Sequence, residues 1–362
     1  METGARPGRW QAVAGVGVAH LDAPLRISPV GLFTREMREE EEDRILASGA
    51  TRSALGARRA IPEPPDPLRT GFQRDVDRIL HCTPWRRTAG KTQVFVWNKD
   101  HQRTRMTHAL EVTQIGESIA RAARLNVDLV RAICLGHDLG HGPFGHASER
   151  ALAPLVAGGF DHALWGANVT AVPLNLTEEV LDGIRHHSWS LPTPLTPEGA
   201  VASLADRLAY LASDAEDALA AGVVTPSDFP PDIWRAVGGR KREFIADVIG
   251  SVLRVITETG IIGFELEVGE VLQQVRDFAY ARIYHRPASE VQGAAVAEFL
   301  PRLVLRLAEE APEILDVSGG QDDETLIRSA VGYVVGCTDK YSIDLADQYG
   351  VAVPVAIREH AV

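Results

Sequence analysis

Histidine and aspartate residues gather in the middle of this 362-residue chain. Eight of its twelve histidines lie between residues 101 and 187, and one of them begins the pair His137-Asp138. His108 precedes this pair and Asp206 follows it, each in a segment of its own. Two imidazoles and two carboxylates from separate helices suit a divalent metal, because each offers a lone pair and the carboxylates offset the charge. We therefore predict that these four residues bind one divalent metal ion.

The donor types narrow the choice of ion only in part. Mn²⁺ or Mg²⁺ is our first expectation, with Fe²⁺, Ni²⁺ and Zn²⁺ as alternatives, since a mixed set of nitrogen and oxygen donors does not decide among them. Four protein donors leave two positions of an octahedral ion for water and for a phosphate oxygen. An open metal site of this kind is typical of a catalytic metal rather than a structural one.

Three amphipathic helices are predicted to carry these donors. In residues 106–125 the positions 108, 112, 115, 119 and 122 repeat at helical spacing, so His108 is expected on a buried face. Residues 127–138 form the next predicted helix, which ends at the His-Asp pair. The third helix, over residues 201–220, carries three polar residues at intervals of four, Asp206, Tyr210 and Asp214. Inward-facing side chains of neighbouring helices can meet in a single site.

The remaining segments predict an all-α protein with one short β-hairpin. Residues 1–36 show little periodicity and are expected to form a loose arm. A basic segment follows at 37–105, then the metal-binding core at 106–225 and a C-terminal helical region, 226–362, packed on that core. The expected local elements are helices over 37–46, 72–80 and 144–156, a Pro-rich extended linker at 61–67, and a strand over 92–97 before a turn at 98–100.

Composition and charge limit the classes of protein that fit. The net charge of −12 argues against general binding to nucleic acid or an anionic membrane. Residues 52–105, however, carry a local excess of seven positive charges, which suits a polyanionic substrate or a solvated basic face. The three scattered cysteines indicate no disulfide framework, and no apolar run approaches the roughly 20 residues of a membrane span. We therefore expect a cytoplasmic protein without a membrane partner.

Eight short sequence runs resemble one known family in their order along the chain. They are GFQRD (71–75), KTQVF (91–95), RTRMTHALEV (103–112), HDLGHGPFGHA (137–147), GFDH (159–162), RHH (185–187), ADRLAY (205–210) and TDKY (338–341). Together they resemble the HD-superfamily deoxynucleoside triphosphate triphosphohydrolases, and more closely the bacterial deoxyguanosinetriphosphate triphosphohydrolase-like proteins. The resemblance extends over residues 37–350. It implies an all-α HD-domain fold with a C-terminal helical extension, and metal-dependent hydrolysis of a dNTP, dGTP among them, to deoxynucleoside and inorganic triphosphate.

The resemblance also implies roles for individual residues. It gives the same four metal ligands, His108, His137, Asp138 and Asp206. The implied catalytic residues are His146 with its partner Glu149, then His141 and His162. The resemblance gives Arg207 a contact to the phosphates. From helical spacing we expect Arg105 at the phosphates and Tyr210 and Asp214 at the sugar, and the charge of Arg74 makes it a further candidate contact. Water is expected to attack the α-phosphorus while the 5′-oxygen leaves, with His146 as acid or base.

Two other functions remain open from the sequence. One is an HD phosphohydrolase that removes phosphates stepwise or acts on another nucleotide. The other is a nucleotide-sensing or single-stranded nucleic-acid-binding oligomer with little turnover, which would use the basic segment before Arg105. The resemblance implies a homo-oligomer, a tetramer or hexamer, in which a dNTP activator can bind between subunits.

Overall fold

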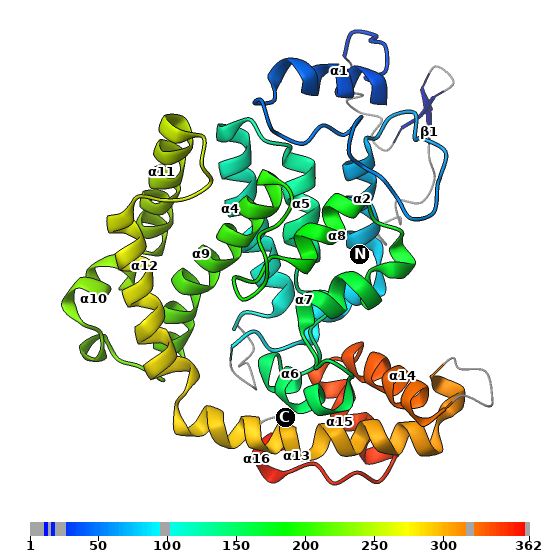
Figure 1. The fold of residues 1–362 in the computed structure, drawn as a ribbon, viewed down its shortest axis with the longest axis vertical. Coiled ribbons are helices and arrows are strands. Elements are labelled where there is room, and N and C mark those ends of the chain that lie inside the picture. Colours follow the sequence, from blue (N-terminus) through cyan, green and yellow to red (C-terminus); the bar gives the residue numbers. More distant parts are fainter. Residues whose placement is uncertain (1–10, 14–15, 19–26, 95–101, 316–321, 359–362) are drawn as a thin grey trace, which may run out of the picture.

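The structure, a computed structural model, describes residues 11–13, 16–18, 27–94, 102–315 and 322–358 (Figure 1). Helices dominate it, because apolar residues recur at helical spacing along most of the chain. The predicted all-α fold class is confirmed. Among the described residues, no helix combines the length and the apolar character that crossing a membrane requires.

Three helices form the centre of the molecule, and each predicted one is present. They are α4 (Arg105–Ala123), α5 (Val127–Gly136) and α9 (Pro197–Ala220), and every pair among them is in contact. The helix α4 buries Val112, Ile115 and Ile119 on one face, as the spacing predicts. The side chains of Thr104 and Asn126 accept hydrogen bonds from free backbone N–H groups at the starts of α4 and α5. These caps fix where the helices begin, and so fix the turns that carry the predicted donors.

Two hydrophobic clusters surround this centre. The larger cluster joins α4, α5 and α9 to the helices α2 (Gly71–His81), α8 (Glu178–Arg185), α10 (Pro231–Val237), α11 (Lys241–Thr259) and α12 (Leu266–Ala279). The smaller cluster joins α6 (His146–Leu152) and part of α7 (His162–Trp165) to α13 (Pro287–Glu310), α14 (Asp323–Val335), α15 (Asp339–Gln348) and α16 (Val355–Arg358). In Figure 1 α13 runs beneath α6, while α11 and α12 lie on the far side of α9. The helices α1 (Arg35–Ile45) and α3 (Thr83–Arg87) complete the N-terminal part.

The strands differ from the sequence-based expectation. A short antiparallel pair, β1 (Gln11–Val13) and β2 (Val16–Val18), lies in the segment predicted to be a loose arm. Its valines favour an extended backbone. Most of the hairpin predicted at 92–100 lies outside the described residues. Of the residues that flank it, Thr92 and Thr104 form one isolated antiparallel bridge.

The helix α6 starts two residues later than predicted. Phe144 and Gly145 have positive φ angles of 64° and 57°, which no α-helix allows. A buried carboxylate causes this conformation in part, because Asp339 Oδ1 accepts a hydrogen bond of 2.8 Å from the Phe144 N–H. A Cβ at Gly145 would lie 2.6 Å from a guanidinium nitrogen of Arg105. The turn therefore brings the start of α6 close to that arginine.

Candidate active site

The four predicted metal donors lie together at the junction of α4, α5 and α9. His108 Nε2 is 2.9 Å from Asp206 Oδ1, which joins the first and the third of these helices. His137 Nε2 is 3.7 Å from the same oxygen and 3.5 Å from Asp138 Oδ1. His108, His137 and Asp138 are buried, and the side chain of Asp206 is 19% exposed. One donor atom each of His108, His137 and Asp206 lies within 4.8 Å of the others, while Asp138 adjoins His137 and forms a second close group with His162 and His187.

The chemistry of these donors fits a divalent metal. His137 Nδ1 donates to the Cys134 carbonyl over 2.7 Å, so the lone pair of Nε2 is free. That Nε2 atom is buried and has no hydrogen-bond partner among the described residues. Metal–ligand distances of about 2.0–2.2 Å place neighbouring ligands of an octahedral ion about 3 Å apart. His108, His137 and Asp206 can therefore hold one divalent ion with Asp138 beside them, although these donors do not select which ion.

Asp138 also connects the metal cluster to two further predicted residues. Its Oδ2 accepts a hydrogen bond of 2.9 Å from Arg105, and its Oδ1 is 3.2 Å from His141 Nε2. Burial raises the pKa of Asp138, but the charges of His137 and Arg105 outweigh burial and hold this pKa well below its ordinary value. Burial and the nearby Arg105 charge lower the pKa of His141. Asp138 is therefore an anion beside a neutral imidazole.

A second group of histidines surrounds Glu149. Its two oxygens pair with His146 Nδ1 at 2.8 Å and with His162 Nδ1 at 2.9 Å. Burial raises the pKa of Glu149, but these two hydrogen bonds outweigh it and hold the pKa far below its usual range. Burial lowers the pKa of His162, and the Glu149 hydrogen bond more than reverses this effect. The His141 and His162 rings stack with centroids 3.7 Å apart. These two residues, His146 and Glu149 therefore form one compact group, the Glu149 histidine group.

His187 belongs to the site, although the sequence reasoning gave it no role. Its Nε2 lies 3.2 Å from His162 Nε2, and its ring centroid is 5.0 Å from that of His137. The Ile184 carbonyl accepts a hydrogen bond from its Nδ1 over 2.8 Å, which leaves Nε2 as an acceptor. Burial lowers the pKa of His187 to about 4. The signal that could have found it is the His-His pair at the end of the histidine-rich stretch.

A cavity of about 450 Å³ opens over both groups. Eleven predicted site residues line it: Arg105, His108, Asp138, His141, His146, Glu149, His162, Asp206, Arg207, Tyr210 and Asp214. His137 lies behind this lining, within reach of the two carboxylates. Arg74 does not line the cavity, since its guanidinium pairs with Glu63 and the Pro64 carbonyl. The structure therefore brings together every predicted residue except Arg74.

Two tyrosines and an aspartate form the wall away from the metal donors. Tyr210 and Asp214 come from α9, and Tyr284 comes from the turn after α12. The Tyr284 hydroxyl donates to Asp214 Oδ2 over 2.5 Å. Burial raises the pKa of Asp214 to about 7, against the opposing effect of this hydrogen bond. Sequence spacing did not predict Tyr284, which lies seventy residues beyond Asp214 in the chain.

The raised pKa of Asp214 predicts a pH-dependent stability. In the unfolded chain this carboxyl ionises near pH 4, whereas in the folded protein it stays protonated until about pH 7. The folded state therefore binds more protons in this window, and its stability falls as pH rises through it. We expect the stability of Asp214→Asn relative to the wild type to rise by about 2 kcal/mol from pH 5 to pH 7. Urea unfolding with a chelator present measures this gain. Equal pH dependence of both proteins would contradict the assignment.

The backbone at Gly140 lies very close to the backbone of His162 and Gly166, which leaves no room for a side chain. A Cβ at Gly140 would lie 2.0 Å from the His162 carbonyl oxygen and 2.3 Å from the Gly166 nitrogen. We expect Gly140→Ala to lower the free energy of unfolding by about 3 kcal/mol, because backbone must move to admit the methyl group. Gly250→Ala, within α11, is the control. Its Cβ would approach only an Arg254 side-chain nitrogen, at 3.4 Å, so a gain of about 0.5–1 kcal/mol is expected.

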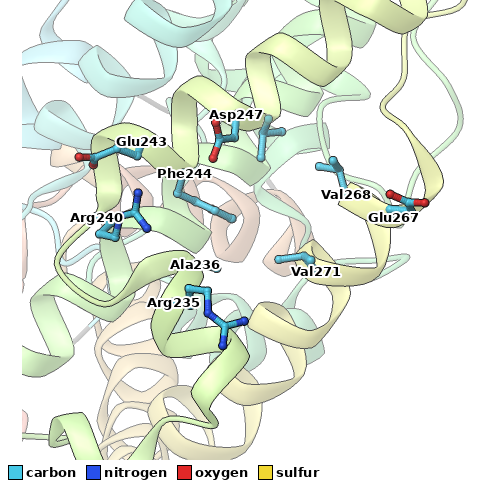
Figure 2. A pocket seen from close by; sticks show the side chains of 10 residues that line it. Arg235, Ala236, Arg240, Glu243, Phe244, Asp247, Glu267, Val268 and Val271 are labelled. Carbon is cyan, nitrogen blue, oxygen red and sulfur yellow. The ribbon is translucent and has the colours of Figure 1, made fainter.

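A second hollow, of about 290 Å³, lies between α10, α11 and α12 (Figure 2). Its apolar residues are Ala236, Phe244, Val248, Val268 and Val271, and its charged residues are Arg235, Arg240, Glu243, Asp247 and Glu267. None of these lining residues, all in the described part of the chain, is a histidine. This hollow therefore lacks the imidazole groups that line the larger cavity.

Comparison with known proteins agrees with the geometry. The HD domain family matches residues 105–211, a range that holds all four predicted metal donors. A deoxyguanosinetriphosphate triphosphohydrolase-like protein of Caldanaerobacter subterraneus subsp. tengcongensis is 36% identical over 323 residues, which cover 85% of this chain and 93% of that protein. A protein of the same name from Desulfatibacillum aliphaticivorans is 40% identical over 272 residues, covering 70% of this chain and 78% of that protein. The chain therefore belongs to the deoxyguanosinetriphosphate triphosphohydrolase-like proteins of the HD superfamily.

Proposed function

We propose that this protein is a metal-dependent phosphohydrolase that cleaves dNTPs, dGTP among them, into deoxynucleoside and inorganic triphosphate. One observation carries the proposal. Three of the four predicted metal donors, His108, Asp138 and Asp206, line the same cavity as the Glu149 histidine group, so a single phosphorus atom can be near a metal ion and a proton-transfer residue. The names of the relatives support the same substrate class.

The size and charge of the cavity support a nucleotide ligand. Its volume of about 450 Å³ lies within the range of about 300–1,000 Å³ usual for small-molecule sites. Two arginines, Arg105 and Arg207, line it near the metal donors and supply N–H groups for phosphate oxygens. The tyrosine wall lies further along α9, where a sugar attached to those phosphates would extend. Tyr210 packed against the sugar would disfavour a ribose, since the additional hydroxyl would lack room or a partner.

The mechanism assigns separate tasks to the residues of the chain. A divalent ion held by His108, His137, Asp138 and Asp206 would polarise a phosphate oxygen and lower the pKa of a water. Arg105 and Arg207 neutralise charge that develops along the phosphates. Glu149 accepts the Nδ1 hydrogen of His146 and orients its ring.

His146 then handles a proton at its other nitrogen, Nε2. That proton goes to the departing 5′-oxygen or comes from the attacking water. Both directions agree with the Glu149 hydrogen bond, which fixes the ring in either case.

Product analysis tests the proposal. The protein is incubated with each dNTP and with Mn²⁺ or Mg²⁺, singly and in mixtures, and the phosphate products are separated. Release of intact triphosphate with the deoxynucleoside is expected. Stepwise release of orthophosphate would favour the alternative HD phosphohydrolase. Binding of single-stranded DNA that persists at about 150 mM salt, without nucleoside release, would favour the nucleic-acid-binding oligomer.

The assembly and the compartment belong to the same proposal. We propose a homo-oligomer, a tetramer or hexamer, with a dNTP activator between subunits, and solution mass measurement tests it. Activity that appears only in dNTP mixtures would support the activator. A cytoplasmic location agrees with the three cysteines, Cys82, Cys134 and Cys337, which are free and buried.

A further inference from the structure

An exposed tryptophan covers one of the cavity arginines. Trp189 lies between α8 and α9, lines the cavity and is 47% exposed. The central carbon of the Arg207 guanidinium lies 3.4 Å from the centroid of its ring. This separation is well inside the about 6 Å limit of a cation–π contact, so the two planar groups are in van der Waals contact.

Arg207 lacks the kind of acidic partner that Arg105 has. Arg105 pairs with Asp138 over 2.9 Å. Arg207, in contrast, has no ion pair with another described residue, and its buried Nε has no hydrogen-bond partner among them. Burial lowers the pKa of Arg207, which reflects the cost of keeping this cation half-buried. The Trp189 ring contacts the face of this cation and leaves its N–H edge unused by the described residues.

The position of Trp189 is fixed by the helix that carries Arg207. Ser203 Oγ donates to the His187 carbonyl, two residues before the tryptophan. Ser203 and Arg207 are four residues apart on α9, so they share one helix face. The segment that carries Trp189 is therefore attached to α9 one turn before the arginine.

We propose that Trp189 is a positioning residue that holds the Arg207 guanidinium by its face, so that the N–H edge points to the triphosphate group of the substrate. A stacked guanidinium keeps its five N–H donors in the plane parallel to the ring, where they can bind phosphate oxygens. A carboxylate in the same place would use those donors and repel the phosphates. The inference rests on the proposed function, and extends it to a residue that is not itself expected to touch the phosphates.

The test measures binding of inorganic tripolyphosphate to the Mn²⁺-loaded protein by calorimetry. Arg207→Ala is expected to weaken binding about tenfold to a hundredfold. Trp189→Ala should weaken it about threefold to thirtyfold, and Trp189→Phe less, since a phenyl ring retains part of the contact. The KM for a dNTP should rise in the same order with unchanged metal content. Addition of tripolyphosphate should also change the emission of Trp189, seen as the difference between the wild type and Trp189→Phe.

A double variant and a control make the outcomes decisive. Trp189→Ala combined with Arg207→Ala should bind no more weakly than Arg207→Ala alone, because Trp189 acts through the arginine. Leu195→Ala should bind as the wild type, since Leu195 lies in the same segment, is 80% exposed and does not line the cavity.

Three results would overturn the inference. If Trp189→Ala bound tripolyphosphate as tightly as the wild type while Arg207→Ala bound it weakly, the positioning role would be rejected. The proposed function would not be affected. If the affinity losses of the two single variants multiplied in the double variant, the tryptophan would contact the ligand itself. Wild-type affinity of Arg207→Ala would remove Arg207 from the triphosphate site, which rejects the inference. Failure of the wild type to release triphosphate from any dNTP would separately reject the proposed function.

Discussion

Replacement of Asp206 by asparagine is expected to remove the bound metal and to reduce triphosphate release about 10³-fold or more. Asp206 Oδ1 lies 2.9 Å from His108 Nε2 and 3.7 Å from His137 Nε2, so this one oxygen joins two other donors. A neutral amide oxygen binds a cation more weakly than a carboxylate does. A catalytic metal stabilises the transition state by several kcal/mol, and about 1.4 kcal/mol corresponds to a tenfold rate change. Metal content by mass spectrometry and the rate of triphosphate release measure both effects.

Asp217→Asn provides the matched control for this variant. Asp217 lies on the same helix, α9, and pairs with Arg103 rather than with the metal donors. Arg103 keeps Glu111 and Glu216 as partners when Asp217 is replaced. Metal content and activity close to the wild type are therefore expected. If Asp206→Asn retained a full complement of metal, Asp206 would not be a ligand and the site would have to be assigned again.

Sequence periodicity predicted the helices that carry the metal donors. His108 shares a helix face with Val112, Ile115 and Ile119, and the structure buries all four residues. The helix α5 ends at Gly136, two residues before the predicted end at Asp138. Helical spacing is a local property, so residues within one helix could be placed from the sequence alone. How the three helices pack is not local. That their donors meet was predicted from the residue types, which suit a divalent metal, and from the resemblance to a known family.

Contacts between distant segments account for what the sequence did not predict. The start of α6 depends on a carboxylate nearly two hundred residues away, since Asp339 binds the Phe144 N–H. Tyr284 reaches Asp214 across the turn after α12. Arg74 was expected near the phosphates because of its charge, but Glu63 and the Pro64 carbonyl hold it elsewhere. Charge identifies a residue that can bind phosphate, whereas its nearest acceptor decides where that residue lies.

The second large effect is expected at His146, whose loss should separate catalysis from metal binding. His146→Ala should reduce kcat for triphosphate release about 10²–10⁴-fold, the usual contribution of a general acid or base. Metal content should stay at the wild-type level, because Glu149 and not a metal donor binds its Nδ1. The side chain is 64% exposed, so its removal leaves no buried cavity and should not unfold the protein. Single-turnover kinetics with metal analysis of the same preparation measures both quantities.

His186→Ala is the matched control for this variant. His186 also pairs with a carboxylate through Nδ1, at 2.8 Å from Asp182, but it does not line the cavity. Removal of His186 tests the loss of an imidazole–carboxylate pair as such, and near-normal kcat is expected. Equal losses in the two variants would mean that general destabilisation, not proton transfer, lowers the rate. Loss of metal from His146→Ala would make His146 a ligand. A slow His146→Ala enzyme with full metal, beside an active His186→Ala enzyme, would place proton transfer at the Glu149 histidine group.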